Sequence, residues 1–214
     1  MNYQTVAGRL AELIRNPAGL FGLVVVAIIL LGFAVSFIWV PYDPAAVNPS
    51  ATWAPPSGDH WLGTDQLGRD IFSMMLVGTR VTVLTSLGGA LIALIAGLLL
   101  TFLITYAPRW LSQLTERITD IWVAFPTLII ALILATAFQG SAVTSAVAIG
   151  LGSAPSVTRT ILPEVRRVSV SDYVLLATAA GARGPWLLHH HIFPNVAPTL
   201  IVRTTQIMGT AALA

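Results

Sequence analysis

Five stretches of the chain are long and apolar, and short polar segments separate them. They cover residues 18–40, 81–107, 118–138, 142–162 and 195–214. A bilayer core of about 30 Å takes roughly 20 residues of helix, so each stretch is predicted to be a membrane-spanning helix, the last one incomplete. The first contains no charged residue, and Pro41 and Asp43 end it. The pattern predicts an all-α membrane protein with several spans.

Small residues mark two of these stretches. Gly88, Gly89 and Gly97 lie in 81–107, where glycines permit close contact between helices in lipid. The stretch 142–162 is rich in Ala, Ser and Gly and is the least hydrophobic of the candidates. We expect it to face other protein rather than lipid.

Composition supports this class. The chain is 56% hydrophobic and 9% charged with a mean hydropathy of +0.81, whereas soluble domains carry about 25% charged residues. It contains no cysteine, which excludes disulfides and thiolate chemistry. The net charge of +2 comes from scattered arginines, so nucleic acid is not an expected partner. The first apolar stretch is too long for a cleavable signal peptide.

The arginines orient the spans. Eight fall on one side of the predicted membrane, together with the N-terminal segment 1–17: Arg9, Arg15, Arg109, Arg117, Arg159, Arg166, Arg167 and Arg183. Arg69 and Arg80 fall on the other side, in the segment 41–80. The positive-inside rule therefore predicts a cytoplasmic N-terminus. Arg203 lies within the fifth span and is expected to face protein or a wet cavity.

The cytoplasmic segment 163–194 is too polar to span a membrane and has the pattern of a helix, a turn and a helix. Ser171 and the following Asp are predicted to cap a short helix that starts at Tyr173. Gly181 suits the turn after this helix, because glycine adopts positive φ at little cost. Pro185 is a favoured first residue for the second helix.

The second helix is expected to stop at Pro194. The resulting knob has small and apolar side chains, so it either docks into a groove on a partner or only links two spans. The residues alone leave both interpretations open.

Residues 173–182, followed by Ile-Phe-Pro-Asn at 192–195, resemble the EAA loop of ABC-importer permeases. Leu175 and Leu176 stand where that motif has Glu and its first Ala, and only Ala177 of the triplet matches. The resemblance implies that this loop fits into a cleft on an ATPase subunit. The residues implied in coupling are Tyr173, Val174, Leu175, Ala177, Ala180, Gly181, Ala182, Arg183, Pro185 and Trp186.

Residues 60–73 closely resemble the H-x-LGTD-x-x-GRD-x-x-S run of one subgroup, the C-type permeases of dipeptide, oligopeptide and nickel ABC importers. Pro41-Tyr42-Asp43-Pro44, Arg80 and Asp120 are also typical of it. The motif residues are Leu62, Gly63, Thr64, Asp65, Gly68, Arg69 and Asp70. From their chemistry, Asp65, Arg69 and Asp70 are predicted to form a local ion network. The motif either fixes the entry to the second span or contacts a binding protein or the outer gate.

Other chemistry has little support in the sequence. His189, His190 and His191 are consecutive, and helical metal ligands need spacing of four residues or help from elsewhere. Asp120 and Arg117 are three residues apart and are predicted to pair. No Walker A loop and no hydrolase constellation occurs, so the chain is not expected to be an enzyme or to bind a metal or cofactor itself.

The resemblance implies a type I ABC importer permease, a helical bundle of which this chain shows five spans of six, in the bacterial inner membrane. It implies peptide import by alternating access. The implied partners are a second permease in a heterodimer, two ATPase subunits or domains that hold ATP and Mg²⁺, an extracytoplasmic substrate-binding protein and membrane lipid. Alternatives are a permease for nickel or another small solute, an integral-membrane enzyme, or a stand-alone secondary transporter, which should show paired broken helices.

Overall fold

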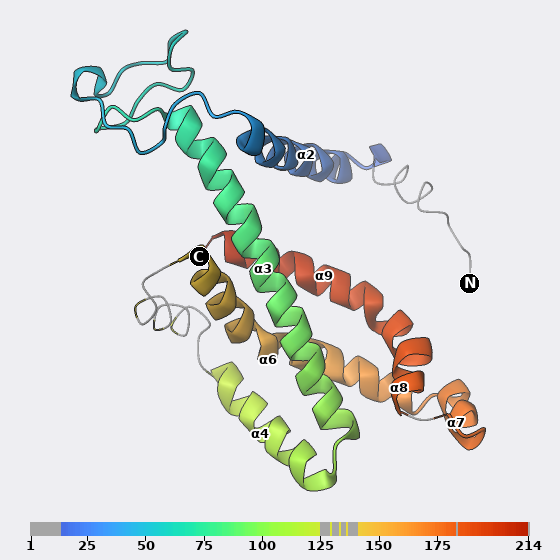
Figure 1. Cartoon of the computed structure of the whole chain (residues 1–214). Coiled ribbons are helices and arrows are strands. Elements are labelled where there is room, and N and C mark those ends of the chain that lie inside the picture. The colour runs from blue at the N-terminus through green and yellow to red at the C-terminus, as the bar shows by residue number, and fades with distance from the viewer. Residues whose placement is uncertain are drawn as a thin grey trace. The chain divides into compact units, whose positions relative to one another are not determined.

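The structure, a computed structural model, describes residues 14–124, 129, 133, 136, 141–182 and 184–213. The chain divides into two compact units, Met1–Val83 and Leu84–Ala214, which are considered separately. Figure 1 shows the helical elements: α2 (Pro17–Ile38), the 3₁₀ turn η1 (Pro49–Ala51), α3 (Ile71–Tyr106), α4 (Arg109–Ala124), α6 (Ala142–Ser169), α7 (Asp172–Ala179), α8 (Gly184–Leu187), the π-helical turn η2 (Leu188–Ile192) and α9 (Phe193–Ala212). In the described part of the chain, no β-strand accompanies these helices.

The first unit contains α2, the loop that follows it and the start of α3. The Asn16 side chain accepts a hydrogen bond from the amide of Ala18 at 3.0 Å, and Pro17 occupies the first turn, so α2 begins with a standard cap. Among the described residues, α2 and α3 are the two helices long and apolar enough to cross a membrane. This agrees with the first two predicted spans.

The helix α3 begins ten residues before the predicted span 81–107, at Ile71. The sequence pattern places residues 71–80 in the extracytoplasmic segment 41–80. They are helical because Asp70 caps the helix through the amide of Ser73 at 2.8 Å.

In the second unit, glycines let α3 and α6 approach closely. A Cβ added at Gly97 would lie 2.6 Å from Cβ of Val157, and one at Gly150 would lie 2.6 Å from Cβ of Ile92. Thr158 donates a hydrogen bond to the Gly97 carbonyl at 3.0 Å across the same contact. The prediction that glycines of the second span permit close helix contact is therefore confirmed, with α6 as the neighbour.

The helix α6 extends to Ser169, beyond the end of the predicted span 142–162. Much of its surface is buried, and its buried residues contribute to the core of this unit with residues of α3, α7, η2 and α9. This burial agrees with the expectation that the fourth stretch faces protein. The predicted third span, 118–138, lies mostly outside the described residues, apart from the end of α4.

Two ion pairs join α4 to α6. Asp120 accepts from Arg159 at 2.7 Å, and Glu116 accepts from Arg166 at 3.0 Å. The predicted partner of Asp120 was Arg117, and this prediction is wrong. The carboxylate of Asp120 instead pairs with an arginine that helix packing brings from 39 residues away.

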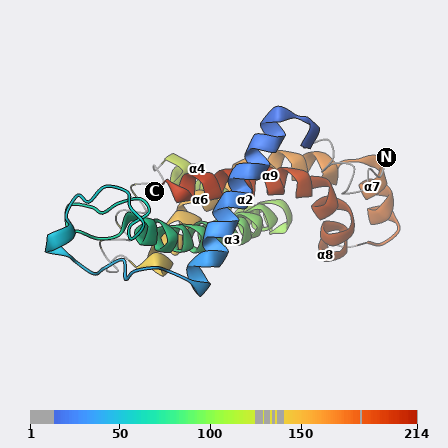
Figure 2. The ribbon, with the colours of Figure 1, turned by 90° about the horizontal axis from the view of Figure 1, so that it is seen from above.

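The sequence predicts that the second helix of the cytoplasmic segment ends at Pro194. This prediction is wrong. The elements α8, η2 and α9 follow one another without a break. Pro194 lacks an N–H, and the π-helical turn before it changes the hydrogen-bond pattern, with the Phe193 amide donating to the Leu188 carbonyl. The chain therefore bulges at this point and continues as α9, which begins at Phe193, before the predicted span 195–214. Figure 2 shows α9 running beside α6, which it contacts.

Candidate functional site

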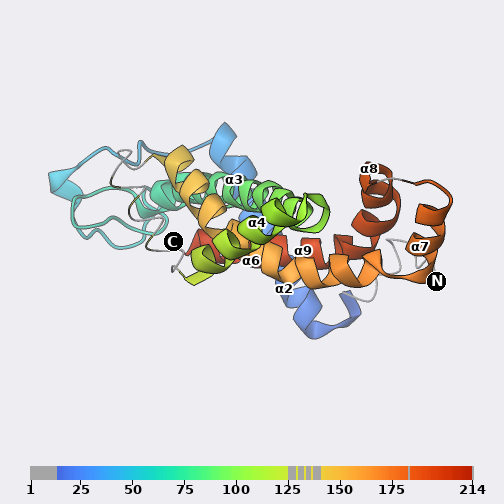
Figure 3. The same ribbon diagram turned by 90° about the horizontal axis from the view of Figure 1, so that it is seen from below.

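The helices α7 and α8 form a hairpin, which Figure 3 shows next to the end of α6. Gly181 follows α7 with φ of +93°. Its amide donates to the Thr178 carbonyl at 3.0 Å, and the Ala182 amide donates to the Ala177 carbonyl at 3.0 Å. This pair of bonds is a Schellman motif, so the predicted glycine turn is confirmed.

The start of α7 differs in detail from the prediction. Ser171 stands at the N-cap, but its hydroxyl donates back to the Val168 carbonyl at 2.5 Å and does not cap α7. The helix begins at Asp172 rather than Tyr173, which places an acidic residue in the first turn, where it complements the helix dipole.

The hairpin presents apolar side chains to its surroundings. Val174 and Leu187 are buried and attach it to the core of the second unit. Tyr173, Leu175 and Leu176 of α7 are exposed, as is Trp186 of α8. Leu175 and Leu176 occupy the positions where the EAA motif has Glu and Ala, so the hairpin is apolar where that motif is partly acidic. Of the other implied coupling residues, Ala177 and Ala182 pack against the core, and Ala180 and Gly181 are exposed. Arg183 and the Pro185 side chain lie outside the described part.

The histidines next to the hairpin pack with aromatic rings. His190 stacks on Trp186 with centroids 4.5 Å apart, and His191 meets the edge of the same ring at 5.3 Å. The ring centroids of Tyr173 and His191 lie 5.7 Å apart. Within the described residues, no three potential ligands gather into a metal site.

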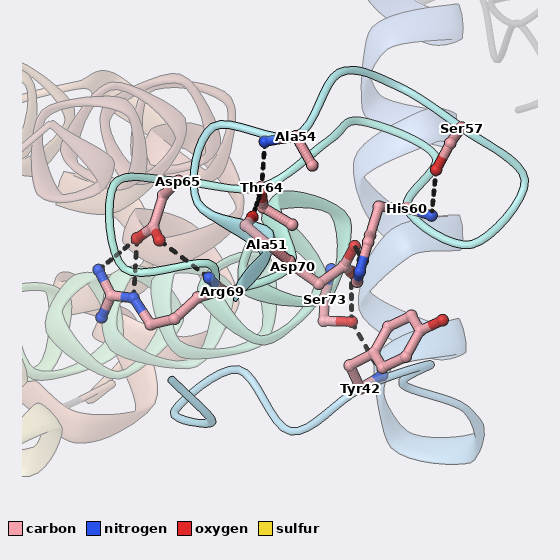
Figure 4. Close-up of polar contacts among 10 residues, drawn as sticks. All are labelled: Tyr42, Ala51, Ala54, Ser57, His60, Thr64, Asp65, Arg69, Asp70 and Ser73. Carbon is pink, nitrogen blue, oxygen red and sulfur yellow. Dashed lines mark hydrogen bonds and ion pairs between the residues drawn. The ribbon is translucent and has the colours of Figure 1, made fainter. Parts of the chain in front are cut away.

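The loop between α2 and α3, residues 39–70, contains the Leu-Gly-Thr-Asp run, and Figure 4 shows its polar contacts. One carboxylate oxygen of Asp65 accepts from the amide of Arg69 at 2.9 Å, as Figure 4 shows. The same oxygen accepts from the amide of Leu67 at 2.8 Å. The other oxygen pairs with the Arg69 guanidinium at 2.6 Å. The hydrogen bond from the Arg69 side chain is the main reason that the pKa of Asp65 lies below its ordinary value of 3.8. Asp65 thus holds a tight turn together.

Asp70 is the buried centre of a second network in this loop. One of its oxygens accepts from the Ser73 amide at 2.8 Å and the Ser73 hydroxyl at 2.7 Å. The other lies 3.0 Å from Nδ1 of His60, which carries the proton of this bond because a carboxylate can only accept. Tyr42 donates its amide to the Ser73 hydroxyl at 3.1 Å. The predicted network of Asp65, Arg69 and Asp70 is therefore only half right, because Asp70 is bonded to His60 and Ser73.

The pKa of Asp70 reflects two opposing causes. Burial of the side chain, which is only 2% exposed, raises the pKa of the carboxyl. Hydrogen bonds from Ser73 and His60 favour the charged form and outweigh burial, so the pKa lies below its ordinary value of 3.8. The sequence had given no role to His60 and Ser73, although both lie in the recognised run. The bond between Asp70 and Ser73 follows the local spacing of a helix N-cap. The pairs His60–Asp70 and Tyr42–Ser73 are 10 and 31 residues apart in the chain, and no local pattern would have found them.

Thr64 and two glycines complete the loop. Thr64 accepts from the Ala54 amide at 2.8 Å and donates to the Ala51 carbonyl. Gly63 and Gly68 have φ of +76° and +74°. Leu62 is exposed. The internal bonding of these motif residues favours the interpretation that the run fixes the entry to α3.

A shallow cleft of about 350 Å³ lies beside this network. Trp39, Trp61 and Phe72 line it, with ring centroids 5.1–6.2 Å apart. Trp39 follows the end of α2, where interfacial aromatics are expected in a membrane protein. Arg80 lies over the Phe37 ring at 5.3 Å.

Long apolar helices, glycine-mediated helix contacts and an exposed helical hairpin are the features of a helical membrane protein. Comparison with known families makes this specific. Residues 89–214 match the family described as the inner membrane component of binding-protein-dependent transport systems, and the chain belongs to that family.

Several curated relatives are similar along most of the chain. A dipeptide transport system permease protein of Alkalihalophilus pseudofirmus is 30% identical over 94% of this chain and 66% of its own length. An oligopeptide transport system permease protein of Bacillus subtilis is 29% identical over 92% of this chain and 64% of its own. A probable D,D-dipeptide transport system permease protein of Escherichia coli is 32% identical over 92% and 66%. The chain thus spans about two thirds of the length of these relatives.

Proposed function

We propose that the chain is a membrane-spanning permease subunit of an ATP-driven ABC importer that translocates peptides. Its family and the peptide permeases among its relatives support this proposal. The single observation that carries it is the hairpin of α7 and α8. This hairpin lies within the family match, turns at Gly181 and exposes apolar side chains.

The proposed topology is multi-pass in the bacterial inner membrane with a cytoplasmic N-terminus. The distribution of arginines supports it, since eight lie on the side assigned to the cytoplasm, whereas Arg69 lies in the loop between α2 and α3 and Arg80 in the first part of α3. The hairpin is then cytoplasmic, and the loop of residues 39–70 is extracytoplasmic.

Each proposed partner has a separate role in transport. An extracytoplasmic binding protein delivers the peptide, a second permease completes a heterodimer, and two ATPase subunits or domains hold ATP and Mg²⁺ and supply the energy. Closure of the ATPase subunits moves the hairpin, and the hairpin moves α6 and α9. The packing of Val174 and Leu187 into the same core as these helices supports such coupling.

The outer loop has a structural role in this proposal. The Asp65 turn and the Asp70 network hold the loop against the start of α3. We therefore assign it the task of fixing the entry to α3, while its surface meets the binding protein.

Cross-linking tests the coupling role directly, because the chain has no cysteine and an introduced one is unique. Leu176→Cys on α7 and Ile201→Cys on α9 are matched, with the native side chains 71% and 69% exposed. In the assembled transporter, a short photoactivatable maleimide at position 176 should cross-link to an ATPase subunit, and one at position 201 should not. Equal cross-linking from both positions, or none from position 176, would contradict the proposal.

A further inference from the structure

A stripe of polar side chains follows one face of α9. Its members are Asn195, Thr199, Arg203, Gln206 and Thr210. Their spacing of three and four residues places them on one side of a helix. A different face of α9 is buried in the core through Val196, Leu200, Ile207 and Ala211. None of the stripe residues is fully buried, so the stripe borders space that the described part of the chain leaves open.

The neighbouring helix α6 meets this stripe with polar groups of its own. Thr199 donates to a carboxylate oxygen of Glu164 at 2.9 Å, and Arg203 donates to the hydroxyl of Ser156. Figure 2 shows the two helices side by side. The seam between α6 and α9 is therefore a polar surface on two helices that are proposed to cross the membrane.

Arg203 has no ion-pair partner within the described part of this surface, and Glu164, the other charged group of the seam, bonds to Thr199. Its guanidinium donates to two neutral acceptors, Ser156 and Gln206, the latter at 2.9 Å. Its Nε is buried and has no hydrogen-bond partner among the described residues. By contrast, the α6 arginines Arg159 and Arg166 each pair with a carboxylate. In the described part of the chain, no carboxylate lies within ion-pair distance of Arg203.

A charged arginine is energetically unfavourable at this position. Arg203 lies near the middle of α9, about ten residues from either end. A charge in the middle of a span is unfavourable, and such residues face a bundle interior or a wet cavity, where they serve a function. A buried, unpartnered donor adds to that cost. Within the described residues, the Arg203 guanidinium therefore has neutral acceptors only.

We propose that Arg203 binds the free carboxylate of a peptide during its passage along the seam of α6 and α9. This inference rests on the proposed function of peptide import. A guanidinium presents a planar fork of donors that matches a carboxylate with two parallel hydrogen bonds. Every linear peptide with a free C-terminus carries this group, so the contact suits a carrier of varied peptides. The polar side chains of Thr199 and Gln206 lie next to Arg203 on the same face of α9.

The test compares a dipeptide that has a free carboxylate with its C-terminal amide. The complete transporter is reconstituted in proteoliposomes with the binding protein, and alanyl-alanine and alanyl-alanine amide are supplied at concentrations that saturate the binding protein. The readout is the ratio of the two ATP-dependent uptake rates. Arg203→Gln should lower uptake of the acid about tenfold or more, as expected for a lost hydrogen bond to a charged group, with little effect on the amide. The ratio should fall toward one.

Arg109→Gln is the matched control, because it removes an exposed arginine at the start of α4 and should leave the ratio unchanged. Arg203→Lys keeps the charge without the fork and should give an intermediate ratio, which also serves if Arg203→Gln does not assemble. A ratio that stays at the wild-type value in the Arg203 variants would overturn the inference, even if both rates fall, because that pattern indicates a structural role. Absence of ATP-dependent uptake of either peptide by the wild-type transporter would instead refute the proposed function, and this inference with it.

Discussion

Replacing Gly68 by alanine should open the loop of residues 39–70 locally. Gly68 has φ of +74°, which costs an L-residue roughly 1–2 kcal/mol. A Cβ at this position would also overlap the carbonyl oxygen of Asn48 and lie 2.8 Å from its carbonyl carbon. The Asn48 backbone must then move, and its amide loses the 3.0 Å hydrogen bond to the Leu67 carbonyl, worth about 1 kcal/mol net.

The expected destabilisation of this loop is therefore about 2–3 kcal/mol, which corresponds to local opening about 30- to 160-fold more often. Hydrogen exchange of the Asn48 amide in the detergent-solubilised protein measures it directly. Gly58→Ala is the matched control in the same loop, because a Cβ there meets nothing within 4 Å and its φ is not positive. Exchange at Asn48 should be unchanged in Gly58→Ala. Equal exchange in Gly68→Ala and the wild type would refute the steric reasoning.

Three further predictions follow from the same structure. Gly97→Val should separate α3 from α6, because a Cβ at position 97 would already lie 2.6 Å from Cβ of Val157. Size-exclusion chromatography should show loss of the monodisperse protein, and a normal elution profile would contradict this prediction. Asp120→Asn should change the melting temperature little. The side chains of Asp120 and Arg159 are 43% and 54% exposed, and exposed ion pairs contribute about 0–1 kcal/mol to stability. A large fall in the melting temperature would contradict this prediction. Asp70 has a lowered folded-state pKa, so its stabilisation is complete above its ordinary pKa of 3.8 and is lost as the pH falls through the folded value. Protease resistance of the outer loop should thus be flat at neutral pH and fall in strong acid, and Asp70→Asn should remove that part of the pH dependence.

Features that depend on short stretches of sequence were predictable. The glycine turn at Gly181 needs only a short helix followed by a residue that tolerates positive φ, and the structure has both. The helices α2 and α3 follow from continuous apolar runs. That Gly97 makes a close helix contact was predictable, since small residues in a span indicate a packed face. Its partner in that contact, Val157, was not predictable.

Features that depend on packing could not be predicted in the same way. Asp120 had one arginine three residues away and another on a distant helix, and the position of α6 against α4 decided between them. The sequence predicts a local network of Asp70 with Asp65 and Arg69, whereas the fold of the loop places His60 against Asp70. Pro194 normally limits a helix, but a π-helical turn rearranges the backbone hydrogen bonds just before it. That Arg203 bonds only to neutral acceptors also became visible only once its neighbours were in place.

The central claim is that this chain carries peptides across the membrane only as part of an ATP-driven assembly. The most direct measurement is uptake of a labelled dipeptide into proteoliposomes that contain the second permease, the ATPase subunits and the binding protein, with and without this chain. Uptake is predicted to require both ATP and this chain, and nickel should not be taken up in its place. Peptide uptake that persists without the chain or without ATP, or uptake of nickel in preference to peptide, would contradict the account.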